Sequence, residues 1–208
     1  MDALAGDRVV VRYRLDAGGP DDRRPAPNPP LEHSPSLSDI TGILVAADDA
    51  ALVIRRDGVD HPVPRTAVTS LRLLSAEVVR NSQIRTVQAE LATGLTGERA
   101  EIDGWELVAD PDSSSPRAVS AAPVGPGAHP VSLPALADWF SARGLRGAVV
   151  LPERLTRPGD GPPGGAEYEV LTAAGLPPAE ALGTDLPARQ SLRAQGYRRH
   201  HSYRLVPL

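Results

Sequence analysis

The sequence predicts an α+β chain of two parts, a small β-barrel over residues 1–75 followed by an α/β unit over residues 80–208. Short runs rich in β-branched residues, separated by turn signals, fill the first part. From residue 80 the pattern changes, and apolar residues at helical spacing alternate with short strand-like runs. The chain has 208 residues, of which 41% are hydrophobic, so it is long enough to form two small cores.

The first part is expected to be an SH3-like barrel. Asp57-Gly58 is a strong hairpin signal between the third and fourth of its strands. The fifth strand should pair with the first, because closure removes the exposed edges of so short a sheet. The five predicted strands are residues 7–14, 39–46, 51–56, 59–64 and 67–74.

A loop over residues 16–38 separates the first two of these strands. It is rich in proline, contains Gly18 and Gly19, and has almost no apolar side chains. This composition predicts a disordered or polyproline-like spacer. A ligand for a proline-recognising domain is the alternative.

The second part is predicted to contain, in order, helix, strand, strand, helix, strand, helix, helix and strand. Asn81 or Ser82 can cap the first helix and Gly94 can end it, whereas Ser132 can cap the second and Arg143-Gly144 can end it. The strands are expected at residues 101–109, 117–122, 148–151 and 197–206, and the two later helices at residues 167–174 and 188–195.

Composition excludes several classes of function. The net charge is −4 and the arginines are not concentrated in one segment, so nucleic acid is not an expected partner. With no cysteine, the chain has no disulfide, thiolate nucleophile or cysteine-ligated zinc. No apolar run approaches the roughly 20 residues of a membrane span, and the start lacks the basic residues of a signal peptide. We therefore expect a cytoplasmic protein without a membrane partner.

Two segments rich in glycine and proline are candidates for phosphate binding. Gly125-Pro126-Gly127 precedes the helix expected at Ser132, and amides near a helix N-terminus can hold a phosphate. Pro126 has no amide, however, and the segment is not adjacent to the cap, so a plain turn is favoured. Residues 157–165 hold too many prolines for a Walker-type or Rossmann loop and are expected to form a linker.

His200 and His201 are the histidines most suggestive of metal binding, because they are adjacent. On the predicted last strand, however, their imidazoles should point to opposite faces and should not share one metal ion. We therefore expect no metal site.

Four carboxylates gather near one predicted strand start: Glu98, Glu101, Asp103 and Glu106. A solvated hairpin rim is the favoured interpretation, and a general base is the alternative. No Gly-x-Ser-x-Gly nucleophile motif occurs. The catalytic and cofactor-binding residues therefore remain unknown from the residues alone.

The order of several short segments carries further information. They are GDRVVVRYRL, a Thr-Gly-x-Leu run at residues 41–44, RRDG, VVRNSQIRTVQ, IDGWELVA, PRAVSAAPVGPG, ADWFSARGL and LRAQGYRRHHSY. In this order they resemble the N-terminal half of bacterial acetyltransferases of the GNAT superfamily that carry an SH3-like domain in front. The resemblance covers nearly the whole chain.

The resemblance implies an SH3-like barrel followed by a degenerate GNAT-like unit, with acetyl-CoA as the cofactor of the family. GNAT enzymes hold the cofactor pyrophosphate on backbone amides of an Arg/Gln-x-x-Gly-x-Gly/Ala loop that opens a helix. This sequence has no such loop, and Val119 stands where the family pattern has a polar Asn. We therefore expect a non-catalytic supporting or regulatory half, with a separate catalytic GNAT chain as a possible partner.

Two other interpretations remain open. The chain could be a protein-interaction module that uses its barrel or its proline-rich loop. It could also be an enzyme with a new site near Arg117, Trp139 and Tyr197.

Overall fold

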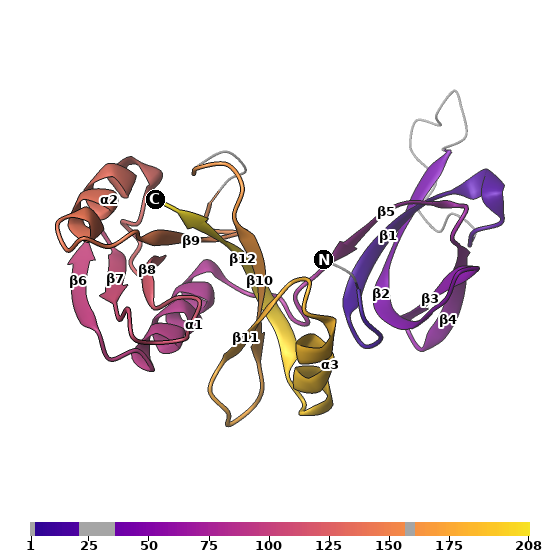
Figure 1. Cartoon of the computed structure of the whole chain (residues 1–208). Helices are drawn as coiled ribbons and strands as arrows, with labels where there is room; N and C mark the ends of the chain where they lie inside the picture. The colour runs from indigo at the N-terminus through magenta and orange to yellow at the C-terminus, as the bar shows by residue number, and fades with distance from the viewer. Residues whose placement is uncertain (1–2, 21–35, 157–160) are drawn as a thin grey trace. The chain divides into compact units, whose positions relative to one another are not determined.

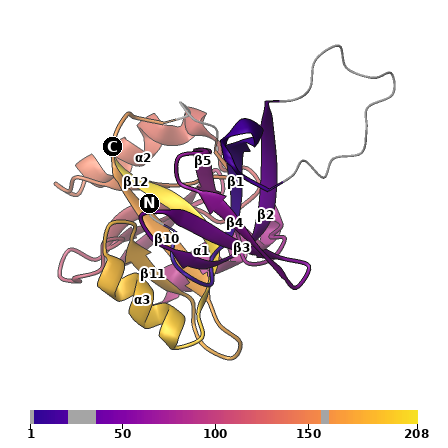
Figure 2. The same cartoon turned by 90° about the vertical axis from the view of Figure 1, so that its right-hand side faces the viewer.

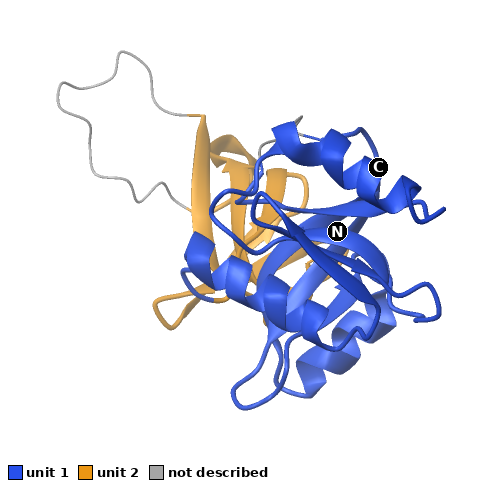
Figure 3. Ribbon diagram, turned by 90° about the vertical axis from the view of Figure 1, so that its left-hand side faces the viewer, with its two compact units in different colours: residues 1, 77–208 blue, residues 2–76 orange. Residues whose placement is uncertain are grey.

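The computed structural model describes residues 3–20, 36–156 and 161–208. The chain divides into two compact units, with the boundary between Ala76 and Glu77 (Figure 3). Each unit has its own sheet. The protein is therefore a mixed α+β protein in which strands predominate.

The first unit contains one antiparallel sheet of five strands in the order β4-β3-β2-β1-β5 (Figure 1). The strands are β1 Arg8–Arg14, β2 Leu37–Ala47, β3 Ala51–Arg56, β4 Val59–Pro64 and β5 Val68–Leu73. The five expected strands are confirmed, and so is the pairing of the fifth with the first. Within the described residues, β4 and β5 are the edge strands, so hydrogen bonding between strands does not close this sheet into a barrel.

Bends and a tight turn shape this sheet. The register shifts between Arg12 and Tyr13 and again between Leu44 and Ala46, and such bulges bend a strand. Asp57 and Gly58 have φ angles of 52° and 78°, which both lie in the left-handed region that a hairpin turn requires. One apolar face of the curved sheet forms the core: Val9, Val11, Tyr13, Ile40, Leu44, Leu52, Ile54, Val63 and Ala67.

The proline-rich loop lies mostly outside the described residues, which omit residues 21–35. Its described start is a short 3-10 turn at Leu15–Ala17, and β2 begins at Leu37. The predictions of a spacer and of a proline-type ligand therefore stay predictions.

The second unit has a mixed sheet of seven strands in the order β11-β10-β12-β9-β8-β7-β6. All neighbouring pairs are antiparallel except β8 with β9, which are parallel. In chain order the elements are α1 Asn81–Thr93, β6 Glu98–Ile102, β7 Trp105–Ala109, β8 Val119–Pro123, α2 Leu133–Ser141, β9 Ala148–Pro152, β10 Ala166–Thr172, β11 Ala179–Leu182, α3 Leu186–Ala194 and β12 Arg198–Pro207. None of the helices in the described ranges has the length and apolar character needed to span a membrane.

The helices cover opposite faces of this sheet. Ala121 of β8 packs in one cluster with Leu136 and Phe140 of α2, whereas Ala122 packs in another with Val87 of α1. This is the alternation expected of consecutive residues in a strand. The sheet is therefore buried on both faces where β8 and β9 lie.

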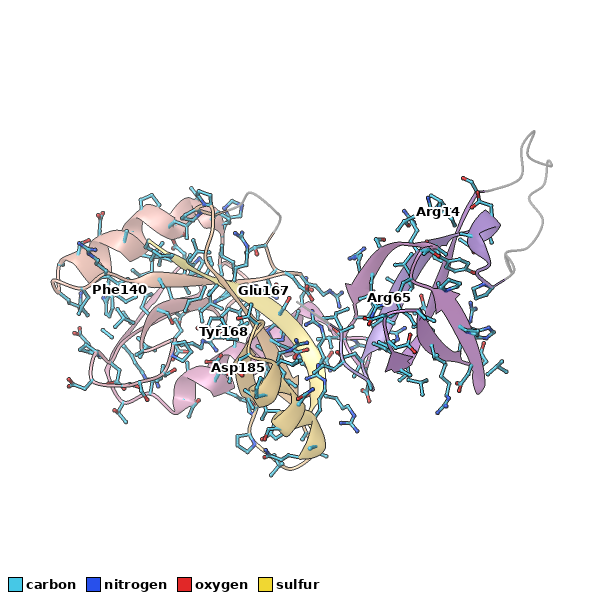
Figure 4. All side chains as sticks on the ribbon, turned by 45° about the vertical axis from the view of Figure 1, so that its right-hand side comes forward. Arg14, Arg65, Phe140, Glu167, Tyr168 and Asp185 are labelled. Carbon is cyan, nitrogen blue, oxygen red and sulfur yellow. The ribbon has the colours of Figure 1, made fainter. Side chains whose placement is uncertain are left out.

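The third helix binds the sheet on the α2 side. Arg189 of α3 contacts Glu169 of β10, and the next residue, Val170, points to the α1 side. Figure 2 shows α3 alongside β11. Asp185, labelled in Figure 4, caps α3 by accepting a hydrogen bond from the Ala188 amide at 3.0 Å.

Two predicted elements of this unit are wrong. The single strand expected at residues 101–109 is a hairpin of β6 and β7, because Asp103 and Gly104 have φ angles of 48° and 82° and make a tight turn. The helix expected at residues 167–174 is β10, whose residues alternate between two buried faces of the sheet. The short strand β11 was not predicted.

Gly97 gives a direct test of how closely β6 and β7 approach. A Cβ added at Gly97 would lie 2.1 Å from the carbonyl oxygen of Ala109, whereas one added at Gly94 would meet nothing within 4 Å. We expect Gly97→Ala to lower the free energy of unfolding by about 1–3 kcal/mol, because backbone atoms must move. Gly94→Ala is the matched control and should be neutral or stabilising by less than about 1 kcal/mol. Urea unfolding of both variants checks this, and equal midpoints would contradict the close approach.

Candidate functional site

The parallel strands β8 and β9 mark the place where an α/β sheet most often binds a ligand, just beyond their carboxyl ends. Their pairing covers only Ser120 with Ala148 and Ala121 with Val149. The last residues of the two strands are therefore not paired with each other. The segment that follows β8, residues 124–132, leads directly into α2 and would meet any ligand bound at this edge.

The backbone amides of this segment are largely used within the protein. Val124 and Gly125 both donate to the carbonyl oxygen of Gly104, at 3.1 and 2.7 Å. The amides of Ala128, Val131, Ser132 and Leu133 donate to Gly125 O, His129 Nδ1, His129 O and Pro130 O. Pro126 and Pro130 have no amide, so Gly125-Pro126-Gly127 is a turn within the fold and does not present consecutive free donors.

Close packing against the β6–β7 turn fixes this segment. A Cβ added at Gly125 would lie 2.8 Å from the Cα of Gly104. A Cβ added at Gly104 would lie 2.9 Å from the amide nitrogen of Ala128. Ser132 occupies the cap position of α2, but its hydroxyl donates to Asp103 Oδ2 at 2.7 Å and makes no capping bond. The predicted cap is therefore correct in position and wrong in its bonding.

A groove of about 630 Å³ lies between α1 and this same segment. Arg85 on its wall donates from Nε to the Gly125 carbonyl at 3.1 Å. The hydroxyls of Thr86 and Thr93 bond back to carbonyls of α1 itself. Its walls also contain Ser82, Ala89, Glu90, Val124 and Pro126. The groove contains no pair of groups arranged for proton transfer or nucleophilic attack.

The acidic patch is distributed over separate surface contacts. Glu98 pairs with Arg143 at 2.5 Å, and this hydrogen bond lowers the pKa of Glu98. Glu106 pairs with Arg99, and Asp103 accepts the Ser132 hydroxyl. These three carboxylates serve structural contacts and the fourth, Glu101, is exposed, which agrees with the rim interpretation.

The structure does not bring Arg117, Trp139 and Tyr197 together. Arg117 is buried on the α1 side of the sheet, where it donates to Gln88. Trp139 lies on α2 with the Arg143 guanidinium 3.7 Å from its ring centroid. Tyr197 donates its hydroxyl to the Pro177 carbonyl at 3.0 Å. The proposed new site near these three residues is therefore wrong.

His200 and His201 do not point apart as expected. A register shift between Val170 and Leu171 marks a bulge in the pairing of β10 with β12. The shift turns the two rings toward each other, and their Nδ1 atoms lie 2.7 Å apart. Burial lowers the pKa of both rings, that of His201 to about 2. Within the described ranges, no three or more His, Cys, Asp or Glu side chains gather as a metal site would require.

A buried ion cluster that the sequence analysis missed lies under α3. Glu169 is fully buried and contacts Arg189 at 3.0 Å, Arg193 at 2.7 Å and Arg199 at 3.4 Å. Burial raises the pKa of Glu169, but the hydrogen bonds and charges of Arg193 and Arg189 outweigh it and lower that pKa overall. The carboxylate is thus held ionised as a structural counter-ion.

A second buried group lies on the α1 side. Tyr203 donates to Glu180 at 2.8 Å and stacks on Tyr168 with ring centroids 5.2 Å apart. Tyr168 is labelled in Figure 4. The Arg117 guanidinium lies 5.3 Å from the Tyr203 ring centroid. Burial raises the pKa of Glu180 and of Tyr203. Tyr203 pairs with Pro152, the last residue of β9, so this group lies beside the carboxyl end of that strand.

The fold and these sites define a two-unit α+β protein whose described residues show no assembled catalytic constellation. Comparison with known proteins then gives the family. The family described as "Probable histone acetyltransferase Rv0428c C-terminal" matches residues 81–193, more than half of the chain. The chain therefore belongs to this acetyltransferase-related family.

One relative supports the same assignment. A protein of Mycobacterium tuberculosis (strain ATCC 25618 / H37Rv) named "Probable histone acetyltransferase Rv0428c" is 31% identical over 151 residues. The match covers 72% of this chain and 45% of the relative, so it spans less than half of the relative's length. No solved structure matches the chain.

Proposed function

We propose that this chain is a GNAT-type acetyltransferase relative that corresponds to a non-catalytic, supporting or regulatory half. Its first unit is SH3-like and its second is a degenerate GNAT-like unit. Family membership supports the link to acetyl transfer. The relative's name says histone acetyltransferase, so histone tails are the first substrates to test.

The observation that carries the non-catalytic role is the state of the amides after β8. A pyrophosphate needs several free N–H groups that converge at the start of a helix. In residues 124–133, six amides are already bonded within the protein and two residues are prolines. The segment would have to release these bonds before it could hold a cofactor as catalytic GNAT proteins do.

The SH3-like assignment of the first unit is supported by its strand order and its bulges. Five short antiparallel strands that share one apolar core, bent at two register shifts, are what a small curled sheet requires. The described residues of this unit, 3–20 and 36–76, show no catalytic constellation of their own. A supporting role, with acetyl-CoA bound by a separate catalytic chain, fits both units.

Calorimetric titration with acetyl-CoA tests this proposal. We expect no binding tighter than a Kd of about 1 mM, which corresponds to roughly −4 kcal/mol. The same sample should show no acetyl transfer to histone-tail peptides or to a panel of small amines. A micromolar Kd, or turnover by the chain alone, would overturn the non-catalytic role. A catalytic GNAT enzyme titrated under the same conditions serves as the positive control.

A further inference from the structure

Four side chains from three parts of the second unit form one hydrogen-bonded chain. Arg117, which precedes β8, donates from Nη2 to the Gln88 Oε1 atom of α1. The Gln88 Nε2 atom lies 2.6 Å from His201 Nε2, and His201 Nδ1 lies 2.7 Å from His200 Nδ1 on β12. Gln88 and His201 are fully buried and Arg117 is 2% exposed. We call these four residues the hydrogen-bond chain.

Arg117 determines which atom donates and which accepts in every bond of the hydrogen-bond chain. A guanidinium only donates, so Gln88 must present its carbonyl oxygen to Arg117 and its NH₂ group to His201. His201 Nε2 is then an acceptor, and the proton of neutral His201 must be on Nδ1. That Nδ1–H donates to His200 Nδ1, which leaves the proton of neutral His200 on Nε2.

An added proton has no acceptor anywhere along the chain. On His200 Nδ1 it would face the Nδ1–H of His201. On His201 Nε2 it would face the NH₂ group of Gln88, and a rotation of that amide would turn the NH₂ group toward Arg117. The buried charges that face His201 are also cationic, namely Arg117 and Arg199, with His200 as a third when it is protonated.

The nearby carboxylates are held by other groups. Glu180 accepts the Tyr203 hydroxyl and lies 3.9 Å from the Arg117 guanidinium. Glu169 is enclosed by arginines, and Glu153 accepts the Ser202 hydroxyl. None of the described hydrogen bonds joins a carboxylate to either imidazole. Protonation of the pair therefore gains no compensating ion contact.

We propose that the hydrogen-bond chain is an acid-sensitive switch that fastens α1 to the bulge of β12 only while both histidines are neutral. Addition of one proton breaks at least one bond and releases the bulge from α1. The same directions disfavour a metal ion at the two Nδ1 atoms. A metal-bound His201 would carry its proton on Nε2, opposite the NH₂ group of Gln88.

Imidazole nitrogen NMR on the whole chain tests the bond directions directly. We expect His201 as the Nδ1–H tautomer and His200 as the Nε2–H tautomer at pH 7.5. At pH 5.5 His201 should still be neutral in the molecules whose hydrogen-bond chain is closed, and protonated only in the minority in which it has opened. Protection of α1 and β12 amides against hydrogen exchange should fall by about tenfold from pH 7.5 to pH 5.5, after correction for intrinsic rates. The opposite tautomers, or a His201 that titrates near pH 6.5, would overturn the proposal.

Gln88→Glu provides a second test, because it places a hydrogen-bond acceptor opposite His201 Nε2 where the wild-type amide places a donor. A carboxylate accepts from Arg117 and from His201 alike, so His201 Nε2 becomes a donor and a doubly protonated ring becomes favourable. We expect the His201 pKa to rise above its ordinary value, and the acid-induced loss of protection to shrink or change sign. Gln88→Met, of similar shape and without either polar group, should not raise it. An unchanged His201 titration in Gln88→Glu would contradict the switch.

Discussion

Replacing Glu169 by glutamine is expected to lower the free energy of unfolding of the second unit by about 3–5 kcal/mol, which is the usual cost of breaking a buried ion pair from one side. Glu169 is the carboxylate that contacts Arg189, Arg193 and Arg199, and none of these four side chains is more than 10% exposed. A neutral amide leaves their charges without that counter-ion. It also replaces one accepting oxygen by a donor.

Urea unfolding followed by far-UV circular dichroism measures this loss. Glu98→Gln is the control, because Glu98 also loses an arginine contact but is exposed, so its midpoint should hardly move. A loss in Glu169→Gln no larger than in the control would show that the buried arginines are satisfied without the carboxylate.

The ion cluster also explains how α3 is attached. Arg189 is the single buried residue of α3, and no α3 residue belongs to the four apolar clusters of the described structure. Helices α1 and α2 pack on the sheet through apolar residues such as Val87 and Phe140. Helix α3 is attached to the sheet by ion pairs instead. The helix that opens first in Glu169→Gln should therefore be α3.

Much of the fold was predictable because its signals are local. The strands of the first unit are short β-branched runs, and Asp57-Gly58 marks a turn that β3 and β4 need. Gly94 directly follows Thr93, the last residue of α1, as expected of a glycine that ends a helix. In these places propensity, pattern and turn chemistry agree.

The two wrongly predicted elements, residues 101–109 and residues 167–174, have specific physical causes. Asp103-Gly104 carries the same turn signal as Asp57-Gly58, but the apolar residues on both sides made residues 101–109 read as one strand. In β10, Glu169 is a charged residue at a fully buried strand position, so the strand pattern is interrupted and resembles a helix. A charge in the middle of an otherwise apolar run was the available signal for a buried ion cluster.

The buried polar sites could not be predicted, because their members are far apart in the chain. Gln88 and His201 are separated by 113 positions, and Arg117 joins them from a third segment. The adjacency of His200 and His201 is visible in the sequence, but the bulge that turns the rings together depends on pairing with β10. Such pairing is set by the tertiary fold and leaves no local pattern.

Acidification from pH 7 to pH 5 is expected to lower the free energy of unfolding of the second unit by about 2 kcal/mol through His201 alone. In the folded protein the pKa of His201 is lowered to about 2, chiefly by burial and then by the charges of His200, Arg117 and Arg199. In the unfolded chain the ring has its ordinary pKa near 6.5. As the pH falls, a group with a lowered folded pKa is protonated in the unfolded state before it is protonated in the folded state. The contribution of His201 to the free energy of unfolding is therefore fully present above about pH 6.5 and decreases below it.

Thermal or urea unfolding between pH 7.5 and pH 5 measures this slope, and the window separates it from Glu169. Burial raises the folded pKa of Glu180, so that carboxyl changes stability in the opposite direction on acidification. Glu169 has a lowered folded pKa, so its contribution is lost only below the ordinary glutamate pKa near 4.3. His201→Gln removes the titrating ring and should flatten the profile, whereas His61→Gln, in the first unit, should leave it intact. If the free energy of unfolding of the unmodified protein stays level from pH 7.5 to pH 5, His201 takes up its proton in the folded state. The hydrogen-bond chain would then not exclude that proton.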